Sequence, residues 1–164
     1  METLKEILAT KLKNAKKTAI LAVGSSLRGD DVAGLLVAEY LNQFPPKIKG
    51  KHSFKVFIGE TAPENFTGEI RRFEPSHIII VDCAELGEKA GAVRLMSPQE
   101  TRGITFSTHS LPPRVMAQYF SDSFPCEIMM IGIQPKTLKF NESLSKEVRA
   151  SCRKVARSIR DVLS

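Results

Sequence analysis

Aspartate and histidine side chains are spaced along the chain so that they could share one metal ion. Asp30 and Asp31 close the turn SSLRGDD, which follows an apolar segment. Asp82 ends the apolar segment HIIIVD, and His109 lies in STHS, ahead of an expected helix. Two carboxylates and an imidazole with an open coordination position suit a divalent transition metal. The candidates for such a site are therefore Asp30 or Asp31, together with Asp82 and His109.

Each of these side chains also has an ordinary structural explanation. Asp30 and Asp31 could cap the helix that follows them and meet the positive end of its dipole. Asp82 could cap a turn, and His109 could be an ordinary loop histidine. The metal-site hypothesis is supported by the positions taken together. Asp30 or Asp31, Asp82 and His109 would all lie at one edge of the predicted sheet.

The glycine-containing turn at residues 24–29 suggests two other chemistries. It contains neither GK[ST] nor GxGxxG, and the carboxylates after it would repel phosphate, so nucleotide binding is disfavoured. Ser26, Asp82 and His109 follow the Ser, Asp, His order of α/β-hydrolases. Ser26 is not in a GxSxG sequence, and only one short strand separates Asp82 from His109. A Ser26–Asp82–His109 hydrolase therefore remains a minor alternative.

The cysteines and the other histidines are interpreted as structural. Cys83, Cys126 and Cys152 are an odd number at wide spacings, without CxxC or zinc-ribbon patterns. We expect inert thiols of a cytoplasmic protein. His52 and His77 have basic or apolar neighbours, which is typical of structural or solvent-exposed histidines.

Strands and helices are expected to alternate along the chain, which predicts an α/β fold with a mostly parallel sheet. The five expected strands are residues 18–24, 53–58, 77–82, 92–96 and 127–133. The expected helices are residues 4–12, 33–41, 65–73, 110–120 and 143–163. The first, third and last strands are continuously apolar, as in sheets covered on both faces. We therefore predict a three-layer sandwich with the first and third strands adjacent at its centre.

The predicted topology would bring the candidate residues to one edge of the sheet. Sites in such folds lie at the carboxyl ends of the strands, near the point where the strand order reverses. Asp30 and Asp31 follow the first strand, and Asp82 is expected to be the last residue of the third. Residues 97–108 are long enough to return the chain to this edge, at up to about 3.3 Å per residue.

Composition predicts a single globular domain over residues 1–164, which begins with an amphipathic basic helix in residues 1–17. Of the 164 residues, 42% are hydrophobic and 26% charged. No aliphatic run approaches the about 20 residues of a membrane helix. Residues 1–17 lack the apolar core of a signal peptide. We therefore expect a cytoplasmic protein without membrane insertion.

The formal net charge is +6, which permits an acidic partner without requiring one. The basic residues of the last expected helix recur at helical spacing opposite its apolar residues, which indicates a solvated face. Aromatic side chains do not interleave with them, so we expect no nucleic-acid partner.

The segments GSSLRGDDVAG, IIIVDCAE and STHSLP, in this order, resemble the hydrogenase maturation endopeptidases. The loop ETAPEN before a helix is similar to theirs as well, and MMIGIQP resembles the branch that serves hydrogenase-3-type and energy-converting hydrogenases. The resemblance covers nearly the whole chain. It implies a three-layer α/β/α sandwich around a mixed, mostly parallel five-stranded sheet.

The resemblance also implies a function. These endopeptidases, sometimes classed as aspartic-type, remove a C-terminal extension from the large-subunit precursor of nickel–iron hydrogenases after metal insertion. Their metal-contacting residues correspond to Asp31, Asp82 and His109, which become the expected catalytic and metal-contacting residues. The precursor would contribute the nickel, and the isolated protein, expected to be a monomer, would hold none tightly. The alternative is a non-catalytic nickel-sensing or nickel-delivery chaperone that uses the same three residues.

Three positions depart from the family pattern. Ser25 stands where an asparagine is usual after the first glycine. Ile58 stands where the family has an aspartate, and Glu60 where it has a glycine. The acidic position of that loop is therefore either lost or moved by two residues.

Overall fold

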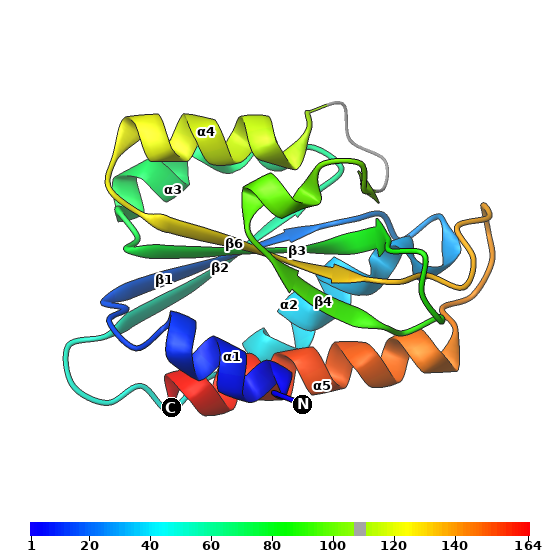
Figure 1. The fold of residues 1–164 in the computed structure, drawn as a ribbon, viewed down its shortest axis with the longest axis horizontal. Coiled ribbons are helices and arrows are strands. Elements are labelled where there is room, and N and C mark those ends of the chain that lie inside the picture. The colour runs from blue at the N-terminus through cyan, green and yellow to red at the C-terminus, as the bar shows by residue number, and fades with distance from the viewer. Residues whose placement is uncertain (107–110) are drawn as a thin grey trace.

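The computed structural model describes residues 1–106 and 111–164, and its centre is one mixed β-sheet (Figure 1). The strand order is β2-β1-β3-β6-β4, and β5 pairs with β3 outside this path. Four strands are parallel to one another, and β4 and β5 are antiparallel to their partners. The strands are β1 (Lys17–Val23), β2 (Ser53–Glu60), β3 (His77–Glu85), β4 (Val93–Met96), β5 (Thr105–Phe106) and β6 (Glu127–Ile133).

Helices cover both faces of the sheet, which makes three layers. Figure 1 shows α1, α2 and α5 below the sheet and α3 and α4 above it. The helices are α1 (Leu4–Lys11), α2 (Ala33–Gln43), α3 (Thr67–Phe73), α4 (Pro113–Ser123) and α5 (Lys146–Leu163). Short 3-10 helices are η1 (Gly29–Val32), η2 (Pro63–Phe66) and η3 (Pro98–Thr101). The predicted three-layer α/β/α architecture is confirmed.

Strand β3 explains why the central strands are apolar throughout. Ile79 and Val81 pack with α1, α2 and α5, whereas Ile78 and Ile80 pack with α3 and α4. Successive side chains of a strand point to opposite faces, so a strand between two helical layers must be apolar at every position. β3 lies beside β1 at the centre of the sheet, as predicted.

Two details of the expected sheet were wrong. β3 continues to Glu85, so Asp82 lies inside the strand and is not its last residue. The sheet also has a sixth strand, β5, whose two residues pair with Ala84 and Glu85. This antiparallel pairing extends β3 beyond its apolar run, and two residues are too few to give a periodic sequence signal.

The start of α2 sits directly on the ends of β1 and β3. A Cβ atom added to Gly34 would lie 2.3 Å from the carbonyl oxygen of Val23 and 2.4 Å from that of Val81. Only a residue without a side chain permits this approach. It places η1, which precedes α2, at the point between β1 and β3 where the strand order reverses.

The last helix is amphipathic as predicted. Val148, Val155 and Ile159 of α5 are fully buried against the sheet, and its basic residues lie on the opposite face. In the described parts of the chain, no helix combines the length and apolarity needed to cross a membrane.

Candidate functional site

Asp31 lies in η1 and is fully buried. Its carbonyl oxygen accepts a hydrogen bond from the Ser25 amide at 3.1 Å, which closes the turn after β1. A Cβ atom on Gly24 would lie 2.1 Å from that same oxygen, and Gly24 has a φ of +151°. The glycine therefore allows the turn to fold back tightly and hold Asp31 at the carboxyl edge of the sheet.

The carboxylate of the neighbouring Asp30 forms hydrogen bonds with the loop between β6 and α5. It accepts hydrogen bonds from the amides of Lys136 at 2.7 Å, Thr137 at 3.1 Å and Ser145 at 2.7 Å. The Ser145 hydroxyl donates a fourth at 3.0 Å. The capping explanation for the two aspartates was wrong for α2, whose N-cap is Val32 without a side-chain bond. Asp30 instead supports the start of α5, where Ser145 is the N-cap.

Asp82 supplies the second carboxylate from β3 and is 1% exposed. Its Oδ1 accepts a hydrogen bond from the Cys83 amide at 2.7 Å. Because side chains alternate along a strand, Asp82 is on the same face as Ile78 and Ile80, which is covered by α3 and α4. Asp31 lies on η1, which leads into α2, so the two carboxylates come from different elements.

The buried thiol of Cys83 lies at the same end of β3 as these carboxylates. Burial raises the pKa of Cys83 well above its usual value, and the negative charges of Asp82, Asp31 and Asp30 raise it further. All three carboxylates therefore lie within electrostatic range of the Cys83 thiol. Carboxylates buried in one region favour a cation near them.

His109, the third predicted ligand, lies outside the described residues. Phe106, three positions before it, pairs with Ala84, two residues after Asp82. Within residues 1–106 and 111–164, no group of three or more histidine, cysteine, aspartate or glutamate side chains could hold a metal ion. The convergence of Asp31, Asp82 and His109 thus stays a prediction.

The cysteines are poor nucleophiles in this structure. Burial raises the pKa of Cys126 to about 11, and burial together with the charge of Asp30 raises that of Cys152 to about 12. Raised values keep these thiols, like that of Cys83, protonated near neutral pH. The thiolate is the reactive form, so a cysteine-protease mechanism is disfavoured.

We expect iodoacetamide at pH 8 to leave Cys83 and Cys152 unmodified in the folded protein and to leave peptidase activity unchanged. Raised pKa values leave almost no thiolate at that pH, and both side chains are buried. Mass measurement of the protein beside an activity assay checks this, with urea-unfolded protein as the fully labelled control. Rapid labelling of Cys83 together with loss of activity would contradict it.

Ser26 gives little support to the hydrolase alternative. It lies in the exposed part of the turn between β1 and η1. The adjacent Ser25 hydroxyl accepts a hydrogen bond from the Leu27 amide, as serines in turns commonly do. A serine hydrolase would instead need the Ser26 hydroxyl bonded to a base.

His52 and His77 are structural, as predicted. The His52 ring lies 3.2 Å from the Thr18 hydroxyl and 3.0 Å from the Ala15 carbonyl oxygen. Burial lowers the pKa of His77, which contacts the Ser76 hydroxyl at 2.9 Å. Both lie at the amino ends of the parallel strands, opposite the edge that carries Asp31.

A second network at the carboxyl edge was not identified from the sequence. Gln134, 4% exposed after β6, accepts hydrogen bonds from the amides of Leu86 at 2.7 Å and Glu88 at 3.3 Å. It donates to the Glu85 carboxylate at 2.7 Å. Gln134 therefore fixes the turn after β3 and orients Glu85. A glutamine directly after a buried strand is the one sequence signal that could have indicated this.

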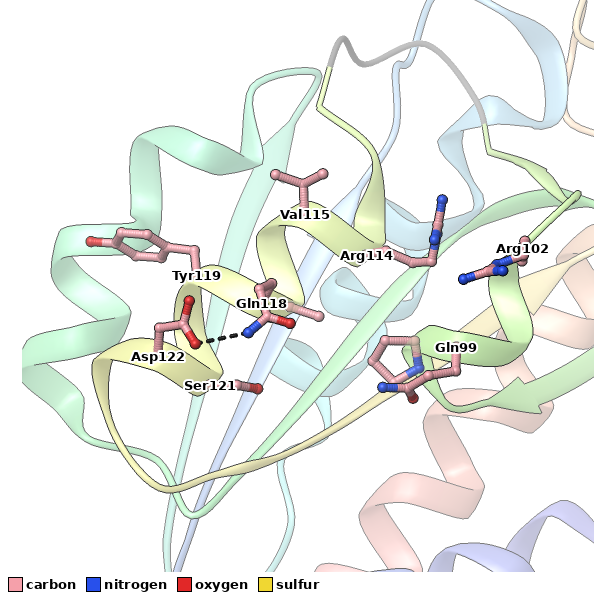
Figure 2. A pocket seen from close by; sticks show the side chains of 10 residues that line it. Gln99, Arg102, Arg114, Val115, Gln118, Tyr119, Ser121 and Asp122 are labelled. Atoms are coloured by element: carbon pink, nitrogen blue, oxygen red, sulfur yellow. Dashed lines mark hydrogen bonds between the residues drawn. The ribbon is translucent and has the colours of Figure 1, made fainter.

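A groove of about 580 Å³ runs between η3 and α4. Figure 2 shows Arg102, at the end of η3, and Arg114, on α4, on facing walls. Neither guanidinium forms an ion pair with a described residue. Val115 and Tyr119 of α4 are 50% and 40% exposed. The groove is therefore partly apolar, and it carries two arginines as well as Asp122.

Comparisons with known proteins agree with this architecture. The sequence profile of the HycI hydrogenase maturation proteases matches residues 36–162. A relative from Methanocaldococcus jannaschii is 34% identical over 164 residues, covering 98% of this chain and 96% of the relative. The hydrogenase 3 maturation protease of Escherichia coli K12 is 30% identical over 131 residues, covering 79% of this chain and 80% of the relative.

The solved structures include one that is similar over almost the full length. A NiFe hydrogenase maturation protease HycI from Thermococcus kodakarensis superposes with a TM-score of 0.84 at 29% identity, covering 96% of this chain and 98% of that one. Sequence profile, relatives and fold thus agree with the resemblance carried by the turn, the third strand and STHSLP. The chain belongs to the hydrogenase maturation protease family and is a peptidase.

Proposed function

We propose that this peptidase removes the C-terminal extension of a nickel–iron hydrogenase large-subunit precursor after nickel insertion, and that Asp31, Asp82 and His109 contact the nickel. The observation that carries the proposal is the pair of fully buried carboxylates, Asp31 and Asp82, at the reversal point between β1 and β3. Two buried carboxylates in low dielectric attract a cation far more strongly than they would in water.

Nickel in this proposal is part of the substrate. A precursor without nickel lacks the ion that the carboxylates bind, so loaded and unloaded precursors differ in affinity. Binding at the carboxyl edge would also hold the scissile carbonyl in one orientation near the ion and near Asp31 and Asp82. The ion would polarise that carbonyl as a Lewis acid. We expect the protein to act in the cytoplasm as a monomer.

The decisive experiment incubates the protein with nickel-loaded and nickel-free precursor and measures the mass of the large subunit. Loss of a C-terminal peptide from the loaded form alone supports the proposal. Equal cleavage of both forms would overturn nickel recognition. A stable complex with the loaded form, without a change of mass, would instead support the nickel-sensing chaperone.

We expect the isolated protein to bind nickel weakly. Three ligands at one edge form an incomplete coordination shell, and the precursor would supply the remaining ligands. Calorimetric titration of nickel into the pure protein, with Asp31→Asn as the control, measures this. A sub-nanomolar site would show that the protein carries its own ion and would contradict delivery of nickel by the substrate.

A further inference from the structure

A pocket of about 230 Å³ lies where the C-terminal halves of α2 and α5 pack together. Arg153, Arg157 and Arg160 line it from α5, at intervals of four and three residues. Such intervals bring side chains to the same face of a helix. Tyr40, on α2, and Phe44, at the end of α2, line the opposite wall. The pocket therefore combines three guanidinium groups with two aromatic rings.

The chain itself neutralises only part of the positive charge in this pocket. In the described parts of the chain, Arg153 and Arg157 form no ion pair. Arg160 pairs with its neighbour Asp161 at 3.0 Å. Like charges three or four residues apart destabilise a helix. The three arginines therefore cost some stability in the isolated protein, and an anionic ligand would offset that cost.

Tyr40 holds the first of these arginines in place. The Arg153 Nε donates a hydrogen bond to the Tyr40 hydroxyl oxygen at 3.0 Å, and the guanidinium carbon lies 5.8 Å from the centre of the ring. A guanidinium has five N–H donors, so the donors on the two Nη atoms remain for a ligand. The Tyr40 hydroxyl also keeps its own hydrogen as a donor. A carboxylate could therefore receive two parallel hydrogen bonds from Arg153.

Phe44 and Ala156 give the pocket an apolar part. The Phe44 side chain is 55% exposed, whereas Ala156 is buried at 5%. Aromatic residues and arginine are enriched in protein interfaces, and arginine and tyrosine are frequent among the residues that contribute most to binding. The ligand that fits this pocket is an acidic peptide segment that also carries an apolar side chain.

Helix α5 connects this pocket with the edge of the sheet that carries Asp31. Its N-cap, Ser145, binds the carboxylate of the adjacent Asp30. At about 1.5 Å per residue, Arg153 lies about 12 Å and Arg160 about 22 Å further along the helix. A standard protein interface covers about 800 Å² of each partner, which is a disc about 30 Å across. One protein substrate could therefore contact both the edge of the sheet and the pocket.

We propose that this pocket docks an acidic segment of the hydrogenase large-subunit precursor, with carboxylates on Arg153 and Arg157 and an apolar side chain on Phe44. The inference rests on the proposed function and adds a second contact surface, away from the nickel. Charge complementarity supports it, because the free guanidinium groups require an anionic partner. Such a contact depends on ionic strength. It should affect KM and leave kcat unchanged, since it is remote from the scissile bond.

Calorimetric binding of the nickel-free precursor isolates this contact, because that precursor lacks the ion for Asp31 and Asp82. At low ionic strength, Arg157→Glu should raise Kd by about 10-fold, and the difference from wild type should shrink at high salt. Phe44→Ala should raise Kd by about fivefold at both salt concentrations. With nickel-loaded precursor, both variants should raise KM without changing kcat. Both should melt close to wild type, because the replaced side chains are exposed.

Lys154→Glu is the matched control. Lys154 is exposed on the same helix and does not line the pocket, so the same change of charge should alter Kd by less than about twofold. Equal weakening by Lys154→Glu and Arg157→Glu would show an effect of net charge and overturn the pocket assignment. Unchanged precursor binding in Arg157→Glu would overturn it as well, and tight binding of inorganic pyrophosphate would then assign the pocket to a small phosphate ligand. Failure of wild type to cleave any loaded precursor would overturn the proposed function instead.

Discussion

Asp31→Asn is expected to slow cleavage of the nickel-loaded precursor by at least about 100-fold while the protein stays folded. Replacing a residue that only supports a metal ligand commonly costs 10- to 100-fold, so loss of a charged ligand should cost more. Asparagine has the size of aspartate and leaves no cavity. It also removes a buried charge that is costly to desolvate. The free energy of unfolding should therefore change by no more than about 1 kcal/mol.

Single-turnover cleavage of loaded precursor, measured beside the melting temperature, checks this expectation. Asp82→Asn and His109→Gln should give similar losses, and combining them with Asp31→Asn should add little, because all three would act on one ion. Ser26→Ala should cleave normally. A variant Asp31→Asn that melts far below wild type yet still cleaves would make Asp31 a structural residue. Loss of cleavage in Ser26→Ala alone would favour the serine hydrolase.

Asp30→Ala is expected to have the opposite effect, a loss of stability. The Asp30 carboxylate accepts four hydrogen bonds, from the amides of Lys136, Thr137 and Ser145 and from the Ser145 hydroxyl. Hydrogen bonds to a charged group contribute about 1.5–3 kcal/mol each, and buried donors left without an acceptor cost further free energy. We expect a loss of about 3–5 kcal/mol, which lowers the melting temperature by about 10 °C or more.

Thermal unfolding monitored by circular dichroism measures this loss, and hydrogen exchange locates it. The amides of Lys136, Thr137 and Ser145 should lose protection in Asp30→Ala and keep it in Asp31→Asn. Ser145→Ala, which removes one donor and the N-cap of α5, should destabilise less than Asp30→Ala. If Asp30→Ala melts like wild type but no longer cleaves, then Asp30 and not Asp31 contacts the substrate.

Much of the fold could be predicted from local patterns because burial dictates side-chain type. Apolar runs such as residues 18–23 and 77–81 occur where a strand has helices on both faces, and this indicated the parallel strands, the layers and the reversal point. The family was identified from motifs at the ends of those strands, and the comparisons confirm it. His109, in contrast, lies outside the described residues, so its place in the site stays a prediction.

The family resemblance had pointed to Asp31 as the metal contact, but only the tertiary structure shows that the adjacent Asp30 is structural. Asp30 and Asp31 are neighbours of identical chemistry, and no local pattern separates them. The donors that bind Asp30 stand 106 to 115 residues further along the chain, so the distinction exists only once the loop after β6 has folded against η1. The same holds for Gln134 and Glu85, 49 positions apart. Hydrogen bonds between distant segments form only when the sheet packs, so they cannot be predicted from local sequence. Apolar periodicity involves consecutive residues and can be.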